Sequence, residues 1–396
     1  MALEQTWRWF GPGDPVTLPE IRQTGAAGIV TALHHVPVGE IWSVEEIGKR
    51  IRLIEENGLR WSVAESLPVH EEIKKRTGRY RQWIENYGES IRNLGKCGVG
   101  TICYNFMPVL DWSRTDLRVR FRDGSITTEF DASAFAAFDM FLLRRTGAEE
   151  GYSREQVSRV REMHDAMTQR EKDRLVETVL LGLPGSLEAF SLEGLRSALN
   201  GYRDVGDADL RRNLYDFIKE IIPVAEESGI LMGIHPDDPP RTLLGLPRVV
   251  SNESDLRRIL EAVDSSANGL TFCTGSLGAG MQNDVPAMAE KFAARINFIH
   301  LRNVARNSEG DFLEENHLEG DVDMYAVMRT LLGEQKRRAE AGRKDNRMPM
   351  RPDHGHLMIP DESRKGIYPG YSLFGRMRAL AELRGLELGI TRSLGL

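Results

Sequence analysis

The stretch Met350-Arg351-Pro352-Asp353-His354-Gly355-His356, near the end of the chain, places a carboxylate and two imidazoles within four residues. It continues a short apolar run that begins at Met348. A run of this length, bounded by polar residues, is typical of a fully buried strand. Asp353 and His354 are therefore expected at the end of a strand.

Three earlier segments share this design, a short and mostly apolar run that ends on a residue type able to bind metals. They end at His235, Cys273 and His300. Histidine, cysteine and aspartate are all common ligands of transition metals. Four strand ends, counting Asp353, that deliver one ligand each to a common point predict a metal site at the mouth of a parallel barrel.

Strand-like runs alternate with helix-like segments along the rest of the chain. Four further strand candidates begin at Thr6, Gly28, Leu59 and Val99. Helix candidates cover residues 19–25, 43–58, 83–95, 214–224, 254–263, 286–294, 322–332 and 373–383. Alternation of strand and helix is the pattern of a parallel sheet. Eight strands with intervening helices predict an α/β fold, a (β/α)8 barrel in which residues 1–396 form a single domain.

The alternation pauses between residues 111 and 205, after the fourth strand. This segment is charged, and capping signals at Ser153 and Thr168 indicate helices, with a break at Pro184–Gly185. We therefore expect residues 111–205 to form a helical insertion over one end of the barrel, with a separate subdomain as the alternative. A second charged segment, the basic stretch 336–344, is expected to be solvated surface.

Composition and charge narrow the class of protein. The 396 residues are 41% hydrophobic and 28% charged, which is ordinary for a soluble globular enzyme. The formal net charge is −7, so we expect no nucleic-acid partner. The apolar runs are too short to span a membrane, and the first residues lack the basic head and apolar core of a signal peptide. Three cysteines make no disulfide framework, so a cytoplasmic protein without a membrane partner is expected.

The four candidate ligands also indicate the kind of metal. Two imidazoles, one thiolate and one carboxylate suit a borderline transition metal such as Zn(II), Fe(II) or Mn(II). A structural zinc site is usually rich in cysteine and closed, whereas this set holds a single thiolate. We therefore expect an open position for a substrate. For each histidine or cysteine taken alone a structural role is the alternative, and the four together favour the metal site.

Other residues near the strand ends are candidates for substrate binding or proton transfer. Arg302, two residues after His300, faces the same side of the strand and could hold a substrate carboxylate or form a surface ion pair. His354, next to a candidate ligand, is a candidate acid or base. The hydroxyl of Tyr371, in the last loop, could reach the site, or its ring could pack against the loop. The two carboxylates after His235 either orient that imidazole or cap the next turn.

Through these residues the chain resembles the mannonate dehydratases of bacterial hexuronate catabolism, which share the xylose-isomerase-like barrel. The resemblance covers essentially the whole chain, including the insertion, and its motifs are long and numerous. They are Thr6–Trp9, Ala32–His35, Cys103–Trp112, His235–Pro240, Cys273–Ser276, His300–Arg302, Gly320–Tyr325, Arg351–His356 and Pro369–Ser372.

The resemblance implies a hydro-lyase that removes water from D-mannonate to give 2-keto-3-deoxy-D-gluconate, with Mn(II) or Fe(II) as cofactor. The matching metal positions are His235, Cys273, His300 and Asp353. His354 and Tyr371 match the positions that move protons. Removal of the C2 proton builds negative charge on the neighbouring carboxylate, which a divalent cation stabilises. Arg302 and His34 or His35 could then hold oxygens of the sugar acid, and a homodimer is expected.

Three other functions compete with this one. A metal-dependent sugar isomerase or epimerase on the same barrel is the nearest alternative, and it would convert a neutral sugar without needing an arginine for a carboxylate. A phosphodiesterase acting on DNA would need several metals and a basic face, which the acidic balance does not supply. A sugar-acid binding protein would have no use for an acid/base pair beside the metal.

Overall fold

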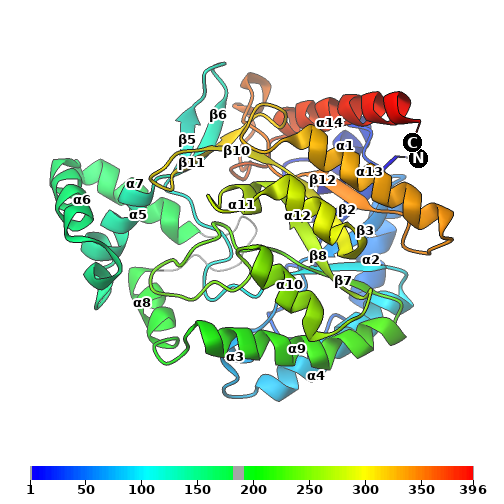
Figure 1. Ribbon diagram of the computed structural model, residues 1–396, viewed down its shortest axis with the longest axis horizontal. Helices are drawn as coiled ribbons and strands as arrows, with labels where there is room; N and C mark the ends of the chain where they lie inside the picture. The colour runs from blue at the N-terminus through cyan, green and yellow to red at the C-terminus, as the bar shows by residue number, and fades with distance from the viewer. Residues whose placement is uncertain (1, 182–190, 396) are drawn as a thin grey trace.

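Eight parallel strands close into a barrel in the computed structural model, which describes residues 2–181 and 191–395. Around the barrel they follow the order β1 (Glu4–Arg8), β12 (Pro349–Pro352), β9 (Ile296–Leu301), β8 (Asn268–Cys273), β7 (Leu231–Ile234), β4 (Thr101–Tyr104), β3 (Arg60–Glu65) and β2 (Gly28–Thr31). Each lies where the sequence predicted a strand. The predicted (β/α)8 barrel is therefore confirmed (Figure 1).

Helices cover the outside of the barrel and bury their apolar faces against it. They are α1 (Leu18–Gln23), α2 (Val44–Glu55), α4 (Tyr80–Lys96), α9 (Asp207–Glu227), α10 (Glu253–Ala262), α12 (Val285–Phe292), α13 (Met324–Glu340) and α14 (Leu373–Leu394). Their buried residues, such as Ile47, Ile91 and Phe217, form one core with residues of the strands. A smaller cluster that includes Cys103 and Phe298 fills the inside of the barrel.

The two ends of the described chain lie side by side (Figure 1). Strand β1 pairs with β12, so that Glu4 is the register partner of Pro349. The backbone N–H of Leu3 also donates a hydrogen bond of 2.6 Å to Glu387 on α14. The barrel is thus closed by residues from opposite ends of the sequence.

The segment 111–205 begins with a β-hairpin, which the sequence analysis did not predict. Strands β5 (Asp116–Arg120) and β6 (Ile126–Phe130) precede the helices α5 (Ala132–Ala137), α6 (Arg154–Ala166), α7 (Gln169–Leu181) and α8 (Leu192–Asn200). The expectation of a helical insertion is therefore wrong for residues 116–130. The missed signal is Asp123–Gly124, a common hairpin turn, with Gly124 at a φ of 87°. The expected break at Pro184–Gly185 lies outside the described residues.

The hairpin belongs to a second, antiparallel sheet of four strands in the order β10-β11-β6-β5. Strands β10 (Asn303–Arg306) and β11 (Phe312–Glu315) follow directly after barrel strand β9. Phe130 of β6 stacks on Phe312 of β11 with ring centroids 5.5 Å apart, within a second hydrophobic core that includes residues of α7 and α8. Because β10 continues from β9, this sheet lies at the carboxyl-terminal end of the barrel, the end that carries active sites in such folds.

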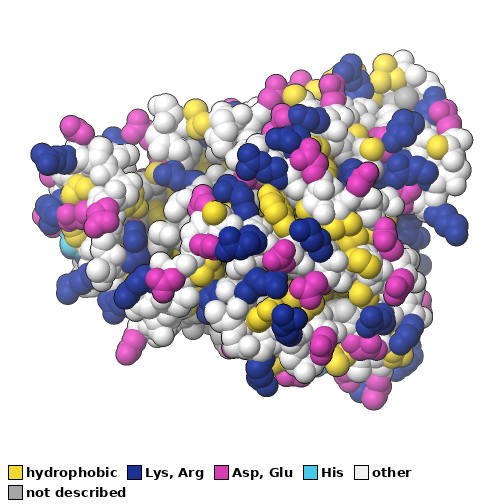
Figure 2. Space-filling view, turned by 60° about the horizontal axis from the view of Figure 1, so that its bottom comes forward, with side chains coloured by type: hydrophobic (Ala, Val, Ile, Leu, Met, Phe, Trp, Pro, Cys, Tyr) yellow, Lys and Arg dark blue, Asp and Glu magenta, His cyan; other side chains and the backbone are white. Residues whose placement is uncertain are grey.

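Arg338 corrects the expectation that the basic stretch 336–344 is solvated surface. This side chain is buried, and it donates hydrogen bonds to Glu334 at 2.7 Å and to the carbonyl oxygen of Ile296 at 3.0 Å, linking α13 to the start of β9. Acidic and basic side chains are interspersed over the face that Figure 2 shows. Among residues 2–181 and 191–395, no helix is both long and apolar enough to cross a membrane.

Candidate active site

Three metal-binding side chains meet at the carboxyl-terminal mouth of the barrel. His235 follows β7, Cys273 ends β8, and His300 lies near the end of β9. Cys273 and His300 are partners in the register of β8 and β9. One ligand atom of each residue lies within 4.8 Å of the others, so the three form a group that can hold a metal ion. The structure thus brings together three of the residues that the sequence pointed to.

The hydrogen bonds of the two imidazoles leave one ring nitrogen of each facing the other. Nδ1 of His235 lies 2.7 Å from the carbonyl oxygen of Pro236, and because a carbonyl only accepts, this nitrogen carries the proton. Nε2 of His235 keeps its lone pair and lies 3.2 Å from Nδ1 of His300. Nε2 of His300 is buried without a hydrogen-bond partner, 3.6 Å from the carboxylate of Glu65. A cation between the rings would use both facing nitrogens, so the donor set fits a metal ion.

Asp353 meets Cys273 and His300 at the same point. Its Oδ2 lies 3.6 Å from Sγ of Cys273, and its Oδ1 lies 3.7 Å from Nδ1 of His300. Burial alone would raise the pKa of Asp353, but Arg351, 2.6 Å away, outweighs it and holds the pKa well below its ordinary value. The N–H and the hydroxyl of Ser276 both donate to Sγ of Cys273, at 3.4 and 3.1 Å, and hold the sulfur in place. The site therefore offers a sulfur and an ionised carboxylate beside the imidazoles.

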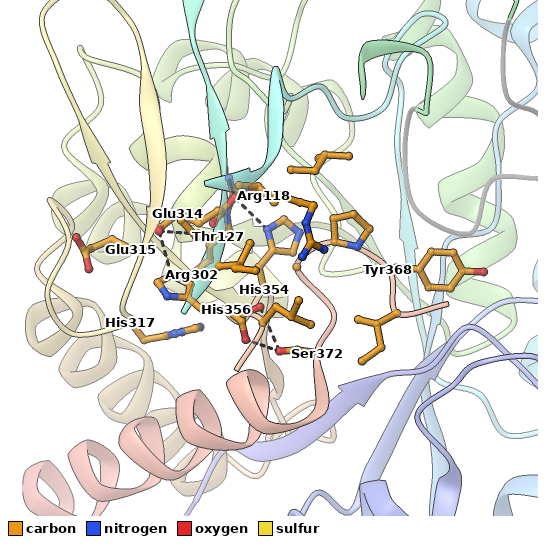
Figure 3. Close-up of a pocket in the computed structure, with 18 residues that line it drawn as sticks. Arg118, Thr127, Arg302, Glu314, Glu315, His317, His354, His356, Tyr368 and Ser372 are labelled. Atoms are coloured by element: carbon orange, nitrogen blue, oxygen red, sulfur yellow. Dashed lines mark hydrogen bonds and ion pairs between the residues drawn. The ribbon is translucent and has the colours of Figure 1, made fainter. Parts of the chain in front are cut away.

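His354 lies next to these candidate ligands, and its ring is hydrogen-bonded to Glu314 of β11 (Figure 3). Burial alone would raise the pKa of Glu314, but Arg302 and His354 outweigh it and hold the pKa well below its ordinary value. The ionised carboxylate can only accept, so Nδ1 of His354, 3.0 Å from Oε1, carries the proton. Nε2 lies on the side of Asp353, 4.0 Å from Oδ2. In this tautomer the lone pair of Nε2 is free to accept a proton.

Tyr371 reaches the site from the loop before α14. Its ring packs edge-on against Phe10 and His354, with centroid distances of 4.8 and 5.2 Å. Burial and the nearby Asp353 raise the pKa of its hydroxyl, which therefore keeps its proton. Tyr371 lines a cavity of about 40 Å³. The lining residues are Arg8, Phe10, Glu65, Ser66, Asn105, Asp111, Trp112, His235, Asp238, Arg351, Asp353, His354 and Tyr371.

A larger cavity of about 190 Å³ also has His354 in its wall (Figure 3). It lies among the β5–β6 hairpin, β11 and the loop before α14, with Arg118, His317 and Tyr368 in its lining. None of the four candidate metal ligands lines this larger cavity. Two of them, His235 and Asp353, line the smaller cavity, so the candidate metal site opens onto the narrower of the two.

Two residues expected to bind substrate have their side chains engaged by other residues of the protein. Arg302 is 1% exposed, and its guanidinium donates to Glu314 at 2.7 Å and to Asp238 at 2.6 Å. Contrary to the expectation, it is committed to a buried cluster and is open neither to a substrate carboxylate nor to a surface ion pair. The side chain of His35 is 55% exposed and lies 2.9 Å from Glu46 on α2, so the structure does not bring it to the site.

Arg8 is a basic residue of the site that the sequence analysis missed. Its Nη1 is buried without a hydrogen-bond partner, 4.0 Å from the carboxylate of Glu65. His34 reaches the site through Arg8, with 3.4 Å between Nε2 and Nη2, and burial together with Arg8 lowers the pKa of His34 to about 3. Arg351 in turn donates to Glu65 at 2.9 Å. Position was the available signal, because Arg8 and Glu65 end strands β1 and β3.

Closed (β/α)8 barrels carry their active sites at this mouth, and the groups gathered here, which could hold a metal ion, give this protein the construction of an enzyme. The family model described as D-mannonate dehydratase (UxuA) matches residues 3–394. The chain belongs to the D-mannonate dehydratase family.

Individual relatives agree with this membership. The chain is 51% identical over 393 residues to the mannonate dehydratase of Marinomonas sp. (strain MWYL1), covering 99% of this chain and 100% of that protein. It is 52% identical over 389 residues to the mannonate dehydratase of Chromohalobacter salexigens, covering 98% and 99%. The crystal structure of mannonate dehydratase from Streptococcus suis serotype 2 superposes with a TM-score of 0.78 at 36% identity, covering 99% of this chain and 95% of that one.

A more distant neighbour shows the fold alone. A xylose isomerase-like TIM barrel protein from Mycobacterium smegmatis, solved in complex with magnesium, superposes with a TM-score of 0.53 at 13% identity, covering 98% of both chains. The barrel is therefore shared with proteins whose sequences have diverged widely from this one.

Proposed function

We propose that this enzyme is a metal-dependent mannonate dehydratase, which removes water from D-mannonate to give 2-keto-3-deoxy-D-gluconate. The observation that carries the proposal is the convergence of His235, Cys273 and His300 within 4.8 Å, beside the buried carboxylate of Asp353. Membership of the D-mannonate dehydratase family supports the substrate. Since the four donors combine nitrogen, sulfur and oxygen, we propose Mn(II) or Fe(II) as the metal.

Binding of the sugar acid is assigned to Arg8, which lines the smaller cavity, with His34 as its neighbour. Arg8 offers a buried Nη1 without a hydrogen-bond partner, which would donate to a carboxylate or hydroxyl oxygen of the substrate. His34 stays neutral, because its pKa is lowered to about 3. Its Nε2 can therefore accept a hydrogen bond from Nη2 of Arg8 and help to orient the guanidinium. In this proposal Arg8 has the role that was expected for Arg302. A bound divalent ion would supply Lewis-acid stabilisation of the negative charge that develops on the substrate.

The two proton-transfer roles follow from the protonation states of the side chains. Nε2 of His354 has a free lone pair and would take the proton from C2. The electron pair of that C–H bond forms the C2=C3 double bond, and the C3–O bond breaks with its electrons going to oxygen. Tyr371, whose hydroxyl keeps its proton, would protonate the departing hydroxyl to water. The enol product then loses its C2 hydroxyl proton and gains a proton at C3 to become the 2-keto acid.

The test strips the protein with a chelator, restores Mn(II) or Fe(II), and adds D-mannonate. We expect the 2-keto-3-deoxy acid to form only with metal, and not from D-gluconate. A neutral ketose serves as the substrate of the alternative, a sugar isomerase or epimerase on the same barrel. Turnover of the ketose without product from mannonate would keep the metal site and assign the enzyme to that alternative.

We also propose a cytoplasmic homodimer. The three cysteines are free thiols, which suits a reducing compartment. Sedimentation of the purified enzyme at two concentrations measures its mass, and a monomer at both would contradict the dimer.

A further inference from the structure

The carboxylate of Glu314, on a strand outside the barrel, binds His354, the proposed base. Its Oε1 lies 3.0 Å from Nδ1 of His354, and both side chains are buried (Figure 3). We infer that Glu314 is a positioning residue of the reaction, which accepts the Nδ1 proton of His354 and thereby turns the lone pair of Nε2 toward C2 of the substrate. This inference rests on the proposed function, because it requires His354 to be the base.

Two arginines keep the carboxylate of Glu314 in place. Arg302 donates from Nε to Oε2 at 2.7 Å, and Arg114 donates from Nη2 to Oε1 at 2.7 Å. The same two guanidinium groups bind Asp238, at 2.6 Å from Arg302 and 3.0 Å from Arg114. The cluster of two cations and two anions is electrically balanced, which burial of charge requires. A proton arriving on His354 would therefore meet an ionised carboxylate already fixed in position.

The backbone of Glu314, like its side chain, is held by hydrogen bonds. The carbonyl oxygen of Glu314 accepts a hydrogen bond from the hydroxyl of Thr127 on β6 at 3.0 Å and lies 3.1 Å from Nε2 of His356. Because β6 belongs to the insertion, the second sheet holds the carboxylate against the loop that carries His354. This gives the β5–β6 hairpin a role in the chemistry, through the position of one carboxylate.

The ring of His354 has little freedom to choose another partner. Gly370, at a φ of 81°, packs so closely that a Cβ there would lie 3.1 Å from Cγ of His354. The ring of Trp112 closes another side, edge-on at a centroid distance of 6.3 Å. Rotation of the ring by half a turn would direct a C–H group at Glu314 and lose a charge-assisted hydrogen bond. The tautomer that leaves Nε2 unprotonated is thus the one that the surroundings select.

The test compares Glu314→Gln with Asp238→Asn in the metal-restored enzyme. Each variant removes one negative charge from the same buried cluster, but only Glu314 contacts His354. The measurements are kcat and KM for D-mannonate, the isotope effect on kcat with deuterium at C2, metal content and melting temperature. We expect Glu314→Gln to lower kcat about 100-fold or more, with KM nearly unchanged, full metal content and a larger isotope effect, because proton removal becomes slower.

Asp238→Asn measures how much of the effect comes from disturbing the buried cluster alone, without a change at His354. We expect it to lower the melting temperature as Glu314→Gln does, with a smaller loss of kcat and an unchanged isotope effect. Equal losses of kcat with equal isotope effects in the two variants would overturn the inference. A wild-type enzyme that forms no product from mannonate would instead overturn the proposed function, and the role of Glu314 with it.

Glu314→Asp covers the case in which Glu314→Gln does not fold. It preserves the negative charge between Arg114 and Arg302 but withdraws it from His354 by one methylene group. We expect this variant to fold, to bind metal and to show the same lowered kcat and larger isotope effect. Wild-type kcat with an unchanged isotope effect in Glu314→Asp would contradict the inference.

Discussion

Nε2 of His235 and Nδ1 of His300 face each other at 3.2 Å, while the other nitrogen of His235 is bound to a backbone carbonyl oxygen. The orientation of the His235 ring is therefore set by the protein itself. A preoriented imidazole lowers the cost of assembling a metal site, and the sulfur of Cys273 and the carboxylate of Asp353 are the donors left to complete it.

Cys273→Ala is expected to lose metal and activity together. The substitution removes the single sulfur donor, and we expect metal affinity to fall at least about 100-fold. Elemental analysis after dialysis against Mn(II) measures this. Cys103→Ala is the matched control, since this buried cysteine lies inside the barrel, and it should keep its metal at a cost of roughly 1 kcal/mol in stability. Full metal content in Cys273→Ala would remove the thiol from the ligand set.

Tyr371→Phe is expected to keep its metal and to lose most of its turnover. Without the hydroxyl the departing C3 oxygen receives no proton, which should lower kcat by about 100-fold to 10,000-fold. Tyr368→Phe is the control on the same loop, and its kcat should stay near that of the wild type. Steady-state kinetics with D-mannonate distinguish the two, and a fully active Tyr371→Phe enzyme would exclude the tyrosine from the mechanism.

Arg8→Met should weaken substrate binding. A charge-assisted hydrogen bond to the sugar acid contributes about 1.5–3 kcal/mol, so KM should rise about tenfold or more while metal content is retained. Arg22→Met on α1 changes a distant arginine in the same way and should leave KM unaltered. An unchanged KM in Arg8→Met would mean that another group holds the carboxylate.

Arg302→Met should act on stability. The guanidinium is buried between Asp238 and Glu314, and its removal leaves the two carboxylates with only Arg114 between them. One buried negative charge is then uncompensated, which should cost about 3–5 kcal/mol in the free energy of unfolding. Arg159→Met, which breaks an exposed ion pair with Glu309, should cost at most about 1 kcal/mol. Denaturant titration of both variants gives the comparison, and equal small losses would show that the buried cluster contributes little.

His317 should make the protein sensitive to acid. Burial lowers the pKa of this imidazole from 6.5 to about 4, so between these values the unfolded chain binds a proton that the folded chain does not. Stability is therefore complete above pH 6.5 and falls as the pH drops toward 4, by on the order of 1–3 kcal/mol from this residue. In His317→Gln the free energy of unfolding should fall less steeply over that range. Parallel pH profiles of wild type and variant would contradict this assignment.

The barrel and its candidate ligands could be predicted from the sequence because both are local signals. A buried parallel strand is a short apolar run, and the residue after it lies at the mouth of the barrel whatever the rest of the chain does. That rule located His235, Cys273, His300 and Asp353. Applied to the other strands, it would also have located Glu65.

The second sheet could not be read in this way. Glu314 reaches His354 only because β11 pairs with β6, about 180 residues away in the sequence, and no local pattern encodes such a partner. The burial of Arg302 has the same origin, since Arg114 and Asp238 come from distant segments. Hydrogen-bond partners of this kind are a property of the assembled tertiary structure.

The pairing of β1 with β12 has a consequence for biosynthesis. During translation β1 leaves the ribosome early, yet its second neighbour is made only when nearly the whole chain has been synthesised. Until then the nascent barrel has an open edge, the type of surface on which strands of other chains can add. Asp353 directly follows β12. The barrel therefore closes, and the last candidate ligand reaches the site, when β12 takes its place between β1 and β9. Chaperone capture of nascent chains should accordingly persist until β12 has emerged.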